Sequence, residues 1–341
     1  MDDLTTSLPI INNRYQISGT IATGGMAVIY KAQDLMLERP VALKILKKDL
    51  SDDLSFQNRF RQEARSSARL NHPNIVTTFD FGYDRDRLFI VMEYVKGTEL
   101  KELMSAEKKV ATKDAIDFLQ QACRGLAYAH QQGFVHCDIK PQNLLVTDEK
   151  VLKITDFGIS RALDTVTREE QADVVWGSPY YISPEQSAGK APSPATDIYA
   201  LGVVAYELFS GQLPFEAENS AELARMHRME IPRPLIEVNP QIPDELNRIV
   251  MRCLEKGPES RYETAGKLDE ALSQVRIPVP ASEPQPVKLQ VPIQSEMEPE
   301  EPETGKPDMA TILLALLALV LAGGLIPFWL YVVLSINSIN R

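Results

Sequence analysis

The most informative part of the sequence is His136-Cys137-Asp138-Ile139-Lys140-Pro141-Gln142-Asn143, with Asp156-Phe157-Gly158 beginning 13 residues after Asn143. The first motif fixes five residue types in a set order, which chance would produce in about one in 10,000 chains of this length. The added triplet makes coincidence negligible. The two motifs therefore mark a functional site, and the flanking sequence indicates its kind.

The two motifs resemble the catalytic and metal-binding loops of the protein kinase family, specifically the eukaryotic-like (Hanks-type) serine/threonine kinases of bacteria. The resemblance covers residues 15–275, about three quarters of the chain. It implies an α+β, bilobal protein kinase fold with a small β-rich N-lobe and a larger helical C-lobe. It also implies transfer of the γ-phosphate of ATP to serine or threonine of protein substrates, with autophosphorylation.

The hydrophobic patterns agree with such a fold. Strand-like segments punctuated by glycines come first, and helical patterns dominate after Tyr94. We expect strands at 15–17, 28–31, 41–45 and 88–94, and helices at 56–70, 112–130, 195–210 and 243–254.

The resemblance implies a role for each polar residue of the two motifs. Asp138 is expected to accept or orient the proton of the substrate hydroxyl, and Lys140 to neutralise the transferring phosphate. Asn143 and Asp156 are expected to hold Mg²⁺, a hard cation that favours oxygen ligands. Lys140 also favours serine and threonine over tyrosine as the acceptor residue.

ATP itself is expected to bind mainly to the N-lobe. Lys44 would hold the α- and β-phosphates, and Glu63, on the predicted helix 56–70, would pair with Lys44. The resemblance implies further ATP contacts from Ile21, Ala22, Thr23, Gly24, Gly25, Met26 and Ile29 in the phosphate-covering loop, from the backbone of Glu93 and Val95, and from Ala42 and Leu145 on the two faces of adenine.

The phosphate-covering loop departs from the family pattern G-x-G-x-x-G. Gly24 is kept, but Ala22 occupies the first glycine position and Ala27 the third. Glycines in this loop let backbone N–H groups approach phosphate oxygens closely. We expect the methyl group of Ala22 to stiffen the loop or weaken ATP binding without abolishing activity.

Cys137 is a second departure, because many kinases have an arginine there that meets a phosphate on the activation loop. We hypothesise that phosphorylation of the segment 159–177 regulates activity less than usual or recruits partners. The candidate phosphosites are Thr165, Thr167 and Ser178.

Three further residues match structural landmarks of the family. Glu185, in Ser183-Pro184-Glu185, is expected to form a buried ion pair with Arg261. Asp197 is expected to hydrogen-bond the backbone of the catalytic loop.

The C-terminal part changes in composition. The domains expected are an N-terminal extension at 1–14, the kinase domain at 15–275, a Pro/Glu-rich linker at 276–308, a transmembrane helix at 309–334 and a short outer tail at 335–341. The uncharged residues 309–334 would form a helix of about 39 Å, enough to cross a hydrocarbon core of about 30 Å. Because ATP is cytoplasmic, we expect a single-pass protein of the plasma membrane with a cytoplasmic kinase domain and lipid contacts through residues 309–334.

Composition limits the other classes of function. The net charge of -11 argues against a general nucleic-acid binder, which normally shows a basic patch. The three cysteines are widely spaced and form no C-x-x-C, so a disulfide framework or zinc site is not expected. Dimerisation of the small lobes is one route for signal input, which makes a homodimer a candidate assembly.

The sequence bears on two alternatives to an active kinase. A membrane-tethered pseudokinase scaffold would share the fold without turnover; Ala22 supports it, and the intact Lys44, Glu63, Asp138, Asn143 and Asp156 argue against it. A dinucleotide-binding enzyme would need G-x-G-x-x-G and a later ribose-binding carboxylate, which are absent.

Overall fold

The structure is a computed structural model, and it describes residues 9–51, 53–85, 87–105, 110–157, 161–162, 178–277, 308–310, 312–314 and 317–318. The chain divides into two units, residues 1–280 and 281–341. The first unit contains both motifs.

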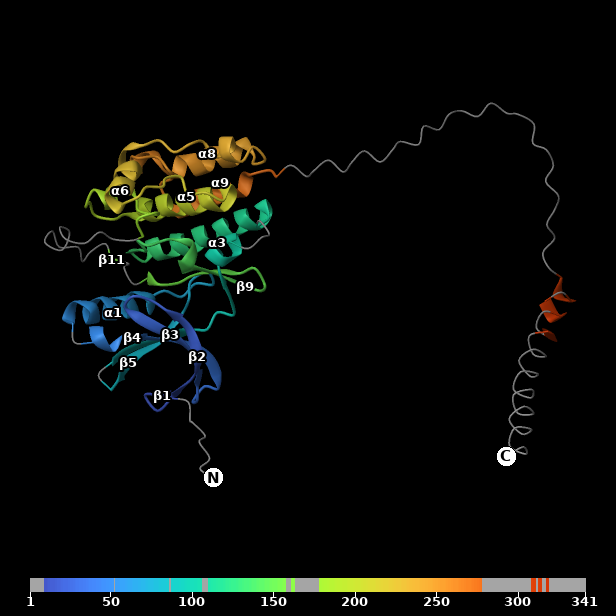
Figure 1. Ribbon diagram of the computed structural model, residues 1–341, viewed down its shortest axis with the longest axis horizontal. Helices are drawn as coiled ribbons and strands as arrows, with labels where there is room; N and C mark the ends of the chain where they lie inside the picture. Colours follow the sequence, from blue (N-terminus) through green and yellow to red (C-terminus); the bar gives the residue numbers. More distant parts are fainter. Residues whose placement is uncertain are drawn as a thin grey trace, which may run out of the picture. The chain divides into compact units, whose positions relative to one another are not determined.

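The N-terminal part of the first unit is an antiparallel sheet of six strands in the order β1-β2-β3-β4-β6-β5, drawn in blue and cyan in Figure 1. Its strands are β1 (Ile10–Ile11), β2 (Tyr15–Thr23), β3 (Ala27–Asp34), β4 (Arg39–Leu46), β5 (Thr78–Asp84) and β6 (Arg87–Glu93). The four strands expected from the sequence all lie in this sheet. β1 pairs with β2 from within the segment assigned to an N-terminal extension.

Alternation along β4 places Lys44 on the inner face of the sheet. Leu43 is fully buried in a cluster on one face, whereas Leu46 packs on the other face against Phe60 of helix α1 (Leu54–Ser67). Lys44 shares the face of Leu46 because side chains two residues apart lie on the same side of a strand. Lys44 and α1 therefore lie on the same side of the sheet.

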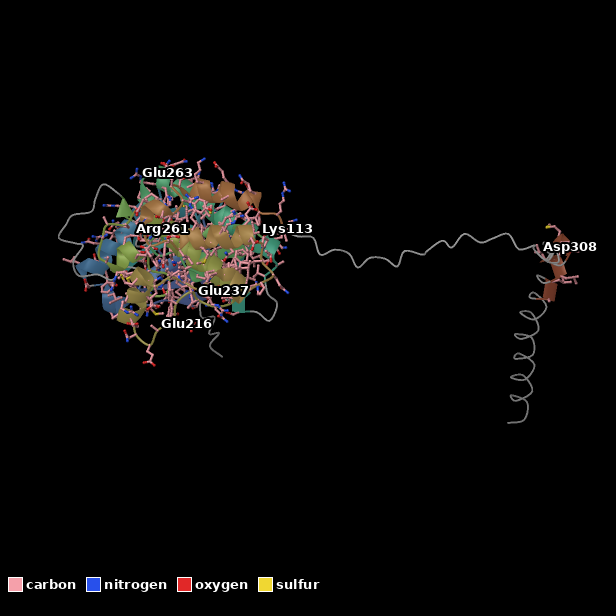
Figure 2. The ribbon with its side chains drawn as sticks, turned by 90° about the horizontal axis from the view of Figure 1, so that it is seen from above. Lys113, Glu216, Glu237, Arg261, Glu263 and Asp308 are labelled. Carbon is pink, nitrogen blue, oxygen red and sulfur yellow. The ribbon has the colours of Figure 1, made fainter. Side chains whose placement is uncertain are left out.

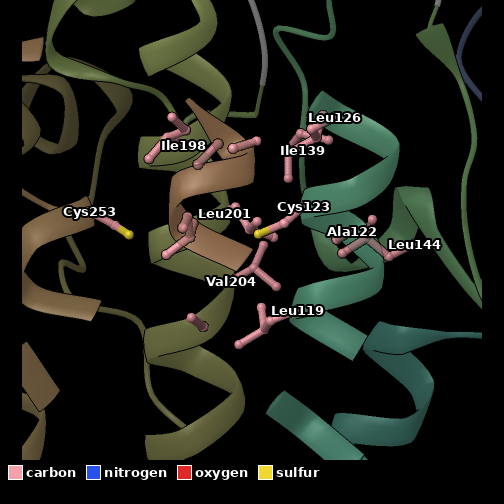
Figure 3. Packing of buried hydrophobic residues seen from close by; sticks show 14 of the residues in the cluster. Leu119, Ala122, Cys123, Leu126, Ile139, Leu144, Ile198, Leu201, Val204 and Cys253 are labelled. Carbon is pink, nitrogen blue, oxygen red and sulfur yellow. The ribbon is translucent and has the colours of Figure 1, made fainter. Parts of the chain in front are cut away.

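The helical part of the first unit is built around α5, which is apolar on nearly all sides and correspondingly buried. Figure 3 shows Leu201 and Val204 of α5 facing Leu119 and Cys123 of α3 across the core. The helices are α2 (Leu100–Ser105), α3 (Thr112–Gln131), α4 (Pro184–Ser187), α5 (Pro194–Ser210), α6 (Ser220–Met229), α7 (Leu235–Val238), α8 (Asp244–Cys253) and α9 (Ala265–Gln274), with short 3-10 turns at Lys48–Leu50, Pro141–Asn143 and Pro258–Ser260.

Short strands between the sheet and these helices carry both motifs. They are β7 (Gly97–Glu99), β8 (Phe134–Val135), β9 (Leu144–Thr147), β10 (Leu152–Ile154) and β11 (Arg161–Ala162). The first motif runs from the end of β8 to the start of β9, and Asp156 follows β10. Because β9 and β10 form an antiparallel hairpin, the two motifs lie at the same end of that hairpin.

The predicted helices at 112–130, 195–210 and 243–254 are confirmed to within one residue at each end. The predicted helix 56–70 begins earlier and ends at Ser67. The predicted helix end at residue 70 was wrong because Leu70 does not extend the face of α1 that packs on the sheet. Leu70 is buried in the core of the helical lobe instead, so the chain leaves the helix to reach it.

The second unit contains the described residues 308–310, 312–314 and 317–318, which are helical from Met309. Among the residues that the structure describes, no helix has the length and apolar character that crossing a membrane requires. Most of the predicted span 309–334 and all of the predicted tail 335–341 lie outside those residues. Most of the predicted linker 276–308 does so as well.

Candidate active site

The carboxylate of Asp138 is held by three neighbours. Lys140 Nζ donates to its Oδ2 at 2.7 Å and the Asn143 amide to the same oxygen at 3.2 Å. The backbone N–H of Ser178 donates to Oδ1 at 3.0 Å. Asn143 also donates to the Asp138 carbonyl at 2.8 Å, which closes the loop on itself. The residues predicted as the catalytic pair are therefore in direct contact.

The backbone of this loop is fixed to α5 through Asp197. The two carboxylate oxygens of this fully buried residue accept hydrogen bonds from the backbone N–H groups of His136 and Cys137, each at 2.8 Å. This confirms the contact predicted for Asp197. His130 Nε2 lies 2.8 Å from the same carboxylate, a contact that no motif indicated.

Cys137 adopts φ +68°, a left-handed conformation that is costly for a residue with a side chain. Its carbonyl accepts a hydrogen bond from Gln186 Nε2 at 2.9 Å, and Gln186 is itself part of the capping box of α4. The side chain of Cys137 is 6% exposed. The Asp197 and Gln186 contacts hold the strained backbone from both sides.

Lys44 joins the sheet, α1 and the second motif. Its Nζ lies 2.5 Å from Glu63 Oε1 and 2.8 Å from Asp156 Oδ1. Burial favours the neutral amine, yet the two carboxylates outweigh it, so the pKa of Lys44 is raised. The predicted pairing of Lys44 with Glu63 is therefore present, and Asp156 completes the cluster.

The two carboxylates of this cluster differ in pKa. Burial raises the pKa of Glu63, and the attraction of Lys44 does not cancel that effect. Burial also acts on Asp156, but the charge and hydrogen bond of Lys44 outweigh it and lower the pKa of Asp156. At neutral pH Asp156 is therefore an anion with 31% of its side chain exposed.

Asn143 and Asp156 offer a donor set that suits Mg²⁺. The backbone N–H of Thr155 donates to the Asn143 carbonyl at 3.0 Å, which places the two motifs side by side. Because the Asn143 amide nitrogen is turned towards Asp138, its oxygen remains as an acceptor. One amide oxygen and one carboxylate match the preference of Mg²⁺ for a few protein oxygens together with phosphate oxygens.

Asp156 is held in position by its neighbours. It adopts φ +60°, and the ring of Phe157 packs against His136 with centroids 4.6 Å apart. His136 Nε2 in turn lies 2.9 Å from the Thr155 carbonyl. Contacts between the two motifs thus hold the strained backbone of Asp156 in place.

An apolar cluster lies beside this polar site. Ala42 and Leu145, predicted to sandwich adenine, belong to one cluster with Ile29 and Val95. Val76 and Met92 are buried in the same cluster and were not predicted as ATP contacts. The N–H of Glu93 donates to the Thr77 carbonyl at 2.8 Å, and its carboxylate pairs with Lys153 at 3.0 Å. The Glu93 carbonyl is thus the backbone group of this residue that adenine would meet.

The predicted phosphate-covering loop is the hairpin between β2 and β3. Ile21, Ala22 and Thr23 end β2, Gly24, Gly25 and Met26 form the turn, and Ile29 lies on β3. Ala22 pairs with Ile29 next to a register shift, and the Gly24 N–H donates to the Ala27 carbonyl at 2.9 Å. An added Cβ at Gly25 would meet no atom within 4 Å. The hairpin itself therefore does not require glycine at position 25.

The candidate phosphosites fall in two places. Thr165 and Thr167 lie outside the described residues. Ser178 is described and half-buried, and its backbone N–H is the group that contacts Asp138.

Glu185 and Arg261 form the predicted buried ion pair, with two N–O distances of 2.8 Å. Figure 2 shows Arg261 within the helical lobe, and its side chain is fully buried. Burial alone would raise the pKa of Glu185, but the hydrogen bonds and charge of Arg261 outweigh it and lower that pKa. Thr196 Oγ1 also donates to Glu185, so the pair connects α4 to α5.

A family model described as the protein kinase domain matches residues 15–273. The chain therefore belongs to the protein kinase family.

Its relatives are bacterial serine/threonine kinases. PrkC of Bacillus subtilis is 42% identical over 259 residues, covering 76% of this chain and 40% of the relative. PknB of Mycobacterium leprae is 36% identical over 283 residues, covering 82% of this chain and 46% of the relative. PknA of Mycobacterium tuberculosis is 39% identical over 285 residues, covering 81% of this chain and 65% of the relative. The chain thus spans less than half the length of PrkC and PknB.

Among solved structures, the kinase domain of PknI from Mycobacterium tuberculosis is similar, with a TM-score of 0.63 and 26% identity. The match covers 78% of this chain and 98% of that domain. It supports the fold assignment independently of the family model.

Proposed function

We propose that this chain is an ATP- and Mg²⁺-dependent protein serine/threonine kinase. The observation that carries the proposal is the position of Lys44 Nζ, which contacts Glu63 of α1 and Asp156 of the second motif at once. The Lys44 ammonium group is thus held both by the N-lobe and by the second motif. Nucleotide phosphates would enter between these two parts of the fold. The serine/threonine-kinase names of the relatives support the same substrate class.

In the proposed reaction, Asp138 takes up or orients the proton of a substrate serine or threonine hydroxyl. The hydroxyl oxygen forms a bond to the γ-phosphorus as the bond to the β,γ-bridging oxygen breaks, and ADP leaves. Lys140, 2.7 Å from Asp138, offsets the charge on the transferring phosphoryl group. Catalysis then consists of positioning and charge neutralisation more than of covalent chemistry.

The remaining site residues bind the nucleotide. Lys44 holds the α- and β-phosphates, and Glu63 holds Lys44. Asn143 and Asp156 hold Mg²⁺, which when bound neutralises phosphate charge. The apolar cluster around Ala42 and Leu145 would enclose adenine, and the β2–β3 hairpin would contact the phosphates.

Membrane attachment is part of the proposal. Residues 309–334 contain no Asp, Glu, Lys or Arg and are long enough to span a hydrocarbon core. Because the kinase reaction uses cytoplasmic ATP, residues 1–308 would face the cytoplasm. The test is fractionation of cells that express the full chain or a chain ending at residue 307. Carbonate-resistant membrane association that needs residues 308–341 supports the anchor, and equal release of both chains contradicts it.

Regulation by the activation loop is proposed to be weaker than in kinases with an arginine at position 137. Cys137 is buried and, unlike an arginine, offers no guanidinium to a phosphate at Thr165 or Thr167. We expect phosphatase treatment to change the activity of the wild-type chain less than that of Cys137→Arg. Equal, strong sensitivity of both proteins would contradict the idea.

The activity is tested with the purified full chain, Mg-ATP and a generic acceptor protein, followed by mass spectrometry of the product. We expect phosphate on serine and threonine, lost in Asp138→Asn and retained in the matched control Asp148→Asn on the exposed turn after β9. ATP binding without transfer in the wild-type chain would instead favour the pseudokinase scaffold.

A further inference from the structure

A cavity of about 500 Å³ opens next to the catalytic carboxylate. Its walls come from α2, the catalytic loop, the segment before α4 and the loop after α5. The lining includes the polar and aromatic residues Lys101, Gln142, Ser178, Tyr180, Tyr181 and Glu216.

The cavity adjoins the place where a substrate hydroxyl would lie. The backbone N–H of Ser178 contacts Asp138 Oδ1 at 3.0 Å, and Gln142 follows Lys140 by two residues. A peptide whose serine or threonine reaches Asp138 therefore brings a neighbouring side chain to this cavity.

One carboxylate near the cavity is already satisfied by the chain itself. Glu207 is buried; its Oε1 accepts from Lys101 Nζ at 2.7 Å and its Oε2 from the Tyr181 hydroxyl at 2.6 Å. Lys101 therefore serves as an internal cation for Glu207. Neither charge of this pair is left over for a ligand.

A second carboxylate is not satisfied. Glu216 is exposed, and none of the ion pairs found within the described residues includes it. Gln142 Oε1 is buried and has no hydrogen-bond partner among those residues. Tyr180 is 43% exposed and offers a ring face. The cavity thus presents unused acceptors, an aromatic surface and one net negative charge.

These features fit a long cationic side chain. Its aliphatic stem would pack on the tyrosine ring, a guanidinium would stack there more favourably than an ammonium, and its N–H groups would reach Glu216 and Gln142. An acidic side chain would be repelled by Glu216 and would have to compete with Glu207 for Lys101. An apolar side chain would leave the acceptor of Gln142 without a donor.

We propose that this cavity binds a basic side chain of the protein substrate, arginine before lysine, next to the phosphorylated residue, and that Glu216 is the specificity-determining residue. The inference rests on the proposed kinase activity. It also implies that Lys101 limits the preference, because it neutralises a carboxylate that a substrate cation would otherwise use.

The test uses the full chain and a set of serine peptides in which a single arginine, alanine or glutamate is moved through the positions flanking the acceptor. At one position we expect the kcat/KM for the arginine peptide to exceed that for alanine by about fivefold at low salt, with a smaller ratio at high salt. Glu216→Lys should reverse the order so that glutamate is preferred, and Glu216→Gln should abolish the preference. Glu218→Lys, an equal charge change two residues away and outside the cavity, should leave the preference unchanged.

Lys101→Met tests the second part of the idea. Because Glu207 then loses its internal cation, we expect the preference for arginine to increase by about fivefold at the same position. A preference that is unchanged or lost in Lys101→Met would overturn the assigned role of Lys101.

Binding measurements separate this inference from the proposed function. Fluorescence anisotropy with peptides that carry alanine in place of the acceptor serine requires no turnover. Equal affinity of the wild-type chain for arginine, alanine and glutamate peptides at every position would overturn the inference, even if the chain phosphorylates a protein acceptor. Selective binding of arginine peptides without any phosphate transfer would support the cavity and contradict the kinase activity.

Discussion

The cluster around Lys44 and the pair formed by Glu185 and Arg261 are built from the same kinds of charge but satisfy them differently. Arg261 uses every N–H of its guanidinium: two contact Glu185 and three contact backbone carbonyls. Lys44 instead faces two carboxylates with one ammonium group. The Glu185–Arg261 pair is therefore closed, whereas the Lys44 cluster has an excess of negative charge.

The closed Glu185–Arg261 pair is also the more buried of the two, and the Lys44 cluster is the more exposed. The side chain of Arg261 is completely buried, whereas 31% of the Asp156 side chain is accessible. A closed, buried pair is suited to joining helices. An open cluster with excess negative charge is suited to a divalent cation and the phosphates that accompany it. Substitutions in the two clusters should therefore separate activity from stability.

Lys44→Met should have the largest effect, on activity. We expect kcat to fall by about a thousandfold, since a charge placed at the phosphates is lost. Stability should fall by only about 1 kcal/mol, because Glu63 already has a raised pKa and can take up a proton when its partner is removed. Steady-state kinetics and urea unfolding measure the two quantities, with exposed Lys48→Met as the control. A large loss of stability with kcat unchanged would remove the distinction between the clusters.

Arg261→Met should have its main effect on stability. The substitution leaves the Glu185 carboxylate buried without its partner, which typically costs about 3–5 kcal/mol. Urea unfolding should show this loss, whereas Arg248→Met, an exposed arginine of α8, should stay within about 0.5 kcal/mol of wild type. If Arg261→Met proved no less stable than Arg248→Met, the pair would not be a structural one.

His227, in the helical lobe, gives the stability of the folded chain a pH dependence. Burial, followed by the charge of Lys256, lowers the pKa of this fully buried histidine to about 4, and Tyr199 lies 2.9 Å from its Nδ1. The unfolded chain binds a proton at pH about 6.5 that the folded chain binds only near pH 4. Stability contributed by His227 is therefore present above pH 6.5 and is lost as the pH falls to 4.

The expected loss over that range is about 3 kcal/mol. Urea unfolding at several pH values should show a steeper decline in wild type than in His227→Gln. Parallel declines would mean that His227 is already protonated in the folded protein at pH 6, contrary to the account.

Glu63→Gln should have the smallest effect, because it keeps the shape of the side chain and removes only the charge that positions Lys44. We expect kcat/KM for ATP to fall by about tenfold, with a rise in KM and little loss of stability. A fall in kcat as large as that of Lys44→Met would show that Glu63 does more than position the lysine.

The sequence predicted the site best where its residues lie close together in the chain. Asp138, Lys140 and Asn143 are within five residues of one another, and their contacts follow from one loop. The pairing of Lys44 with Glu63 was reached only through the family resemblance. No local pattern brings a strand residue to a helix 19 positions later.

The contacts that sequence reasoning missed depend on packing between distant elements. Lys101 meets Glu207 across 106 positions, and His130 meets Asp197 across 67. Val76 joins the apolar cluster around Ala42 and Leu145 because the chain turns after α1 and its backbone bonds to β10, the strand before Asp156. Such contacts are set by how the lobes pack and leave no periodic signal in the sequence.

The fold was predicted with similar limits. The helical pattern located α3 and α8 because each presents an apolar face to one core, whereas α5 is apolar on nearly all sides and is buried within that core. Short strands such as β8 and β11 have two residues each, too few for a pattern, and exist because the catalytic loop is held against the segment after Asp156.

The most direct test of the account is single-turnover transfer of the γ-phosphate by the full chain to a protein acceptor, for wild type and Asp138→Asn, with ATP affinity measured in parallel. We expect transfer to serine or threonine by the wild-type chain. In Asp138→Asn we expect a loss of at least about a hundredfold, with ATP affinity nearly unchanged. Equal transfer by both proteins, or ATP binding by the wild-type chain with no transfer, would contradict the account.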